Sequence, residues 1–64
     1  MASREQLPDN GDIRKVARVL IAKHGARASA VAETRAKQLL DDGDLGAHKL
    51  WRRVAEVIQE LQGT

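Results

Sequence analysis

The two histidines, His24 and His48, are the side chains of this chain best suited to binding a metal ion. Each is expected beside a helix end, and no His-x-x-x-His or Glu-x-x-His pair places two ligands on one helix face. A metal site would therefore have to combine His24, His48 and Asp44 across helices or across a dimer. A structural role for His24 is the favoured interpretation, because an imidazolium near the last carbonyls of a helix is stabilising. We expect no metal, and we place His48 on the outer side of its helix.

Nucleophilic catalysis has equally little support. The serines are Ser3, in the N-terminal arm, and Ser29, near a helix start, and neither lies in a Gly-x-Ser-x-Gly elbow. The chain has no Cys, which excludes disulfides and thiolate ligands, and it has no phosphate-binding loop or dinucleotide fingerprint. The acidic run at residues 41–44 lacks the spacing and the terminal Glu of a calcium loop. We expect neither an enzyme nor a bound cofactor.

Residues 17–36 match part of the pattern of a DNA-binding helix-turn-helix. With Gly25 at the turn, Ala26 and Val31 stand where the motif has small and apolar residues. DNA binding is therefore the alternative function of this chain. Six polar side chains are the candidate nucleic-acid contacts: Arg27, Ser29 and Arg35 on the second helix, and Arg14, Lys15 and Arg18 on the first.

Several residues disagree with the DNA-binding pattern. Ile21 stands where a small residue normally lets the helices approach, and Thr34 where a side chain normally packs inward. Glu33 would face phosphate unfavourably. The formal net charge is only +2, and the basic group at residues 14–18 fits the solvated face of an amphipathic helix. The pattern is explained as well by a Gly-terminated helix followed by an Ala-rich helix.

Composition and spacing predict an all-α protein in which helices position these groups. The chain has no Phe or Tyr, one Trp and one Pro, and no segment alternates apolar with polar residues long enough for a strand. We expect a flexible N-terminal arm over residues 1–11 and a single domain over residues 12–64. That domain is predicted to be a small three-helix bundle, with helices at about 12–24, 27–42 and 45–62.

Capping residues suggest where these helices begin and end. N-caps are expected where a side-chain oxygen can accept a backbone N–H, at Asp12 or its rival Asp9, at Ser29 and at Asp44. Glycines tolerate the left-handed backbone that follows a helix, and they are expected to end the helices at Gly25, Gly43 and Gly63.

Helical periodicity predicts one inward stripe on each helix. The first comprises Ile13, Val16, Ala17, Leu20, Ile21 and His24. The second is rich in alanine and comprises Ala28, Ala32, Ala36, Leu39 and Leu40. The third is the clearest and comprises Ala47, Leu50, Trp51, Val54, Val57, Ile58 and Leu61. Trp51 is expected to anchor the core, with an interface role as the second interpretation.

The apolar supply is thin for a chain of 64 residues, which favours association with another protein. Val19 and Val31 lie off the inward stripes, and with Trp51 they are the candidate interface residues. We therefore predict a protein that acts by protein–protein interaction, as a homodimer or as a small partner of another protein. The longest apolar run, residues 19–22, is far too short to cross a bilayer, so no membrane partner is expected.

The chain resembles a group of short alphaproteobacterial proteins that are classed only as a domain of unknown function. The resemblance covers residues 12–62 and is carried by helix ends and core residues: His-Gly at 24–25, alanines at 28, 32 and 36, Gly-Asp at 43–44, Leu-Trp at 50–51 and Glu-Leu-Gln at 60–62. It implies a bacterial, cytoplasmic, all-helical protein. It implies no activity, cofactor or binding residues.

Overall fold

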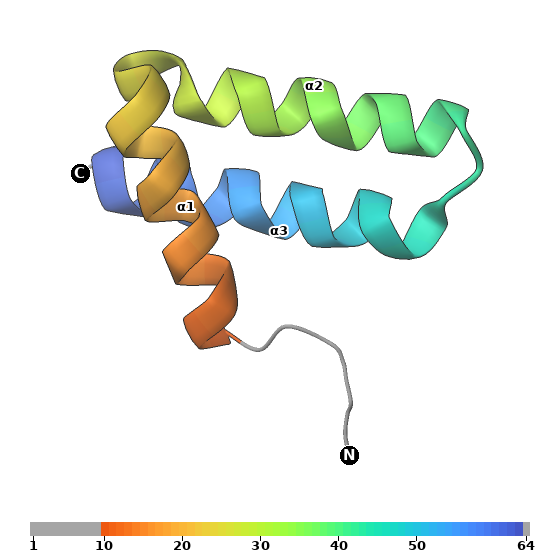
Figure 1. Ribbon diagram of the computed structural model, residues 1–64, viewed down its shortest axis with the longest axis horizontal. Helices are drawn as coiled ribbons and strands as arrows, with labels where there is room; N and C mark the ends of the chain where they lie inside the picture. Colours follow the sequence, from red (N-terminus) through yellow and green to blue (C-terminus); the bar gives the residue numbers. More distant parts are fainter. Residues whose placement is uncertain (1–9, 64) are drawn as a thin grey trace.

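The computed structural model describes residues 10–63, and every element assigned within them is helical. The helices are α1 (Asn10–His24), the short 3-10 helix η1 (Gly25–Arg27), α2 (Ala28–Asp41) and α3 (Leu45–Gln62). Helices α2 and α3 lie side by side as an antiparallel hairpin, and α1 crosses the end of this hairpin where α2 begins and α3 ends (Figure 1). The predicted all-α class and the order of three helices are confirmed.

The first helix begins at Asn10 rather than at Asp12. Asp12 is therefore not an N-cap, because it lies inside the first helical turn, where a carboxylate is stabilised by the positive end of the helix dipole. The rival cap Asp9 and the N-terminal arm, up to residue 9, lie outside the described residues.

The junction between α1 and α2 is a 3-10 turn, and α2 begins one residue later than predicted. Gly25 takes the predicted left-handed conformation, with φ of 58°, and ends α1. The chain then continues in η1, and the Ala28 N–H donates to the Gly25 carbonyl. Ser29 is consequently the second residue of α2 and not its N-cap, so that prediction was wrong. The cap position belongs to Arg27, whose side chain makes no capping hydrogen bond.

Gly43 and Asp44 have the roles predicted for them in the turn between α2 and α3. Gly43 has φ of 82° and donates its N–H to the Leu40 carbonyl, while the Asp44 N–H donates to the Leu39 carbonyl. This pair of bonds is a Schellman motif, which satisfies the last carbonyls of α2. Asp44 is the N-cap of α3, because its Oδ1 accepts the Ala47 N–H at 3.1 Å.

The core is small and rich in alanine. Its buried cluster comprises Ile13, Ala17, Ala28, Ala32, Val54, Ala55, Val57 and Ile58. Among the residues that the structure describes, only two large side chains, Ile58 and Val54, are fully buried. The alanine stripe of α2 lies inward as predicted, and small side chains at this spacing allow α3 to approach closely.

Several residues predicted to lie inward are exposed instead: Val16, His24, Leu40 and Leu61. The first two are on α1, which crosses the hairpin rather than running along it and so buries fewer positions (Figure 1). The two leucines lie in the last turns of α2 and α3, beyond the buried cluster. Ala55 was not predicted as core, yet it is buried.

The close approach of α2 to its neighbours predicts a penalty for adding volume at Ala32. Ala32→Leu should lower the free energy of unfolding by about 1–3 kcal/mol, because Ala32 has no exposed surface. Ala30→Leu is the matched control, since Ala30 is exposed on the same helix and its change should fall within about 0.5 kcal/mol. Urea unfolding followed by circular dichroism measures both, and equal midpoints for the two variants would contradict the packing described above.

Candidate binding surfaces

The structure does not assemble the two histidines into a site. His24 lies in the last turn of α1, where a helix-end position was expected, but it is exposed, so its predicted place on the inward stripe was wrong. His48 is half-buried rather than outward, and its Nδ1 donates to the Ala36 carbonyl at 2.8 Å, a bond that joins α3 to α2. Asp44 is used as a helix cap. Among residues 10–63, no three His, Asp or Glu side chains are grouped so that they could hold a metal ion.

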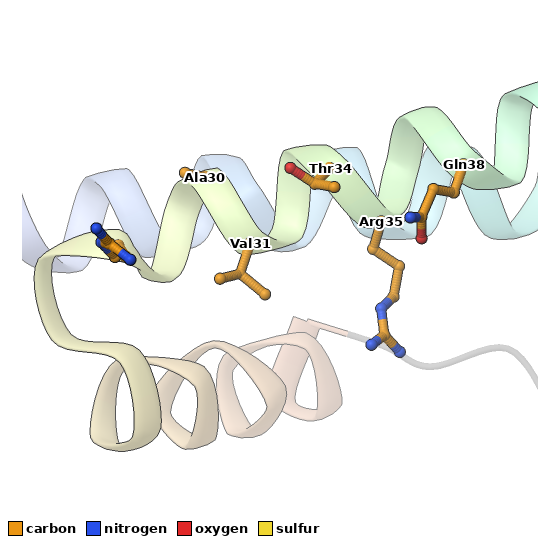
Figure 2. Close-up of a pocket in the computed structure, with 6 residues that line it drawn as sticks. Ala30, Val31, Thr34, Arg35 and Gln38 are labelled. Carbon is orange, nitrogen blue, oxygen red and sulfur yellow. The ribbon is translucent and has the colours of Figure 1, made fainter.

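One side of α2 carries an open groove, which we call the α2 groove. Its volume is about 470 Å³, and it is lined by Arg27, Ala30, Val31, Thr34, Arg35 and Gln38. The side chains of Val31 and Arg35 leave α2 on the same side of the helix (Figure 2). Within the described part of the chain, the lining contains two guanidinium groups and no carboxylate, so this face of α2 is basic.

Trp51 lies at the edge of the core and not at its centre. It is half-buried and packs against the buried cluster, whereas the fully buried large side chains are Ile58 and Val54. The guanidinium carbon of Arg35 lies 5.0 Å from the centroid of the indole ring, within cation–π range. Trp51 therefore holds Arg35, a residue of the α2 groove, against α3.

The residues proposed for DNA contact are divided by the structure. Arg27 and Arg35 line the same groove, but Ser29 is half-buried and does not line it. Glu33 also lies away from the groove, since its Oε2 accepts a hydrogen bond from Gln59 Nε2 of α3 at 3.2 Å. The basic residues of α1, namely Arg14, Lys15 and Arg18, are exposed and do not line the groove.

A second surface runs along the exposed side of α1. Asp12, Val16, Val19 and Lys23 follow one another at intervals of four, three and four residues, which places them in one row along the helix. We call this row the α1 outer stripe. Val16 is 37% exposed and Val19 52% exposed. Val19 was predicted as an interface residue; Val16 was missed because its spacing from Ile13 and Leu20 had placed it inward.

The three candidate interface residues do not form one surface. Val31 lies in the α2 groove and Trp51 beside it, joined through Arg35. Val19 belongs to the α1 outer stripe, and no residue of α1 lines the groove. The molecule therefore offers one apolar surface with charged ends, on α1, and one basic surface, on α2.

Comparisons with known protein families, with curated proteins and with solved structures found no match to this chain. Among residues 10–63, no helix combines the length and the apolar composition that spanning a membrane requires.

The contact between Arg35 and the only Trp of the chain can be tested by fluorescence. Arg35→Gln should expose the indole ring, so that acrylamide quenches its emission more strongly, and should reduce stability by about 0.5–1 kcal/mol. Lys37→Gln is the control, because Lys37 is exposed on the same helix and lines a different hollow. Equal quenching in Arg35→Gln and the parent protein would show that the guanidinium does not cover the ring.

Proposed function

We propose that this protein acts by binding rather than catalysis, as a small interaction module that forms a homodimer. The observation that carries the proposal is the α1 outer stripe, an exposed apolar row with opposite charges at its two ends. The chemistry of this stripe fits a second copy of the same chain.

The size of the core supports association. A domain of about 60 residues buries only about 60% of the surface that its unfolded chain exposes, and oligomerisation is a common remedy. Here half of the buried cluster consists of alanines, whose burial contributes little. Meanwhile five large apolar side chains of the described residues are exposed: Val16, Val19, Leu40, Leu45 and Leu61.

The order of residues in the α1 outer stripe is self-complementary. A two-fold axis midway between Val16 and Val19 is also midway between Asp12 and Lys23. When two copies of α1 pair antiparallel about that axis, Val16 faces the partner's Val19 and Asp12 faces the partner's Lys23. Such an isologous contact closes after two subunits, which limits the assembly to a dimer.

Two of the exposed leucines, Leu40 and Leu45, fit a second copy less well. Leu40 and Leu45 flank the turn between α2 and α3, beside the exposed carboxylates at residues 41, 42 and 44. Two copies meeting at this turn would bring like charges together, which is destabilising. In the antiparallel arrangement of the α1 outer stripe, by contrast, the charged residues that face one another, Asp12 and the partner's Lys23, have opposite signs.

Light scattering over a concentration series tests the proposal. The parent protein should have twice the 7.0 kDa mass of one chain, and its melting temperature should rise with concentration. Val16→Thr/Val19→Thr should weaken dimerisation about tenfold or more, because it keeps the side-chain shape but removes apolar surface. Leu40→Gln/Leu45→Gln is the control and should leave the dimer intact. A monomer at all concentrations, or a dimer lost only in the control, rejects the proposal.

Charge reversal tests the antiparallel orientation. Asp12→Lys and Lys23→Asp should each weaken the dimer, because each places like charges opposite one another at both ends of the contact. Mixing the two variants should restore dimerisation, since every facing pair in the mixed dimer has opposite charges. A parallel contact would bring Asp12 against Asp12 in the parent protein, so neither single variant would then be weaker. Sedimentation of each variant alone and of the mixture distinguishes these outcomes.

A further inference from the structure

We infer that the α2 groove is a binding site for the phosphate backbone of duplex DNA. This inference goes beyond the proposed homodimer and does not depend on it. The groove and the α1 outer stripe lie on different helices, and the groove is lined only by α2 and the preceding turn. The two surfaces therefore share no residue.

The charge of the groove fits a polyanion. Arg27 and Arg35 both line it, and eight residues of helix separate them by about 12 Å along the axis. This separation is large enough for the two guanidinium groups to reach different phosphates. Thr34 and Gln38 add a hydroxyl and an amide on the same face, which can donate to phosphate oxygens or to base edges.

The position of Arg35 is fixed before any ligand arrives. Its guanidinium lies against the Trp51 ring, and a stacked guanidinium keeps the N–H groups at its edge available for hydrogen bonds. Holding a long side chain in place reduces the entropy lost on binding. The nearest carboxylate along the chain, Glu33, accepts a hydrogen bond from Gln59 and lines another hollow with Arg52, so its side chain lies away from the groove.

The shape of the surface favours a duplex over a single strand. Helix α2 has 14 residues and is about 21 Å long, and a three-residue turn joins it to the crossing helix α1. A helix presented in this way can enter the major groove of B-DNA, where Ala30 and Val31 are small enough to allow close approach. No aromatic side chain lines the groove, and single strands are held largely by stacking on aromatic rings.

Fluorescence anisotropy with a labelled duplex of about 20 base pairs, at about 50 mM salt, tests the inference. Arg27→Gln/Arg35→Gln should weaken binding at least tenfold. The matched control is Lys37→Gln/Arg52→Gln. It also removes two positive charges, but from a hollow on another side of the hairpin. The control should change the affinity less than threefold.

The salt dependence gives a second measurement. Between about 50 and 200 mM salt, the slope of log affinity against log salt should be less steep by about 2 per protomer in the groove variant than in the parent protein. Because Arg35→Gln also removes the contact with Trp51, Arg27→Gln alone is included, and it should weaken binding about threefold or more. Circular dichroism confirms that each variant is folded.

Three results would overturn the inference: no binding of the duplex at low salt, equal weakening in the groove variant and the control, or binding of a single strand or of polyglutamate as tight as that of the duplex. The variant Val16→Thr/Val19→Thr distinguishes failure of the DNA-binding inference from failure of the proposed homodimer. If the groove acts as inferred, the variant with the weakened dimer still binds the duplex, and Arg27→Gln/Arg35→Gln still forms dimers.

Discussion

The contact of α2 with α3 through Ala28, Ala32 and Ala36 is the constraint on which the rest of the structure depends. Because these side chains are small, the two backbones lie close together, and polar groups of α3 can reach α2 and the turn before it. His48 reaches the Ala36 carbonyl, and Gln59 reaches Glu33. The same alanines supply little apolar area, so the large buried side chains come from the other two helices, Val54, Val57 and Ile58 from α3 and Ile13 from α1.

Local features of the fold could be predicted from the sequence, whereas the path of α1 could not. Gly25, Gly43 and Asp44 lie where predicted, because a left-handed residue and an N-cap are determined within a few residues. Periodicity identifies residues that share a helix face, but it does not say how much of that face a neighbouring helix covers. Since α1 crosses the hairpin, Val16 and His24 are exposed although they share a face with Ile13.

Some residues of the candidate surfaces could also be predicted from the sequence, whereas the directions of others could not. Arg27 and Arg35 were both predicted as candidate nucleic-acid contacts, and the structure places both in one groove. The direction of Glu33 could not be predicted, because it depends on the position of Gln59 in a helix 26 residues further along the chain. Trp51 was predicted as the central anchor, but Ile58 and Val54 are the fully buried large side chains, and the indole ring is half-buried beside the cluster.

The α2–α3 hairpin is closed at both of its ends. The Schellman turn joins the helices at one end, and at the other Gln62 Nε2 donates to the Gly25 carbonyl at 2.8 Å. Helix α1 is attached to this closed unit mainly through Ile13, Ala17 and the half-buried side chains beside them. The hairpin is therefore the most cooperative unit of the fold, and α1 is the element that can separate from it by partial unfolding. The surface suited to a second copy lies on α1, so self-association and the docking of α1 on the hairpin are thermodynamically coupled. Each of these two events makes the free energy of the other more favourable.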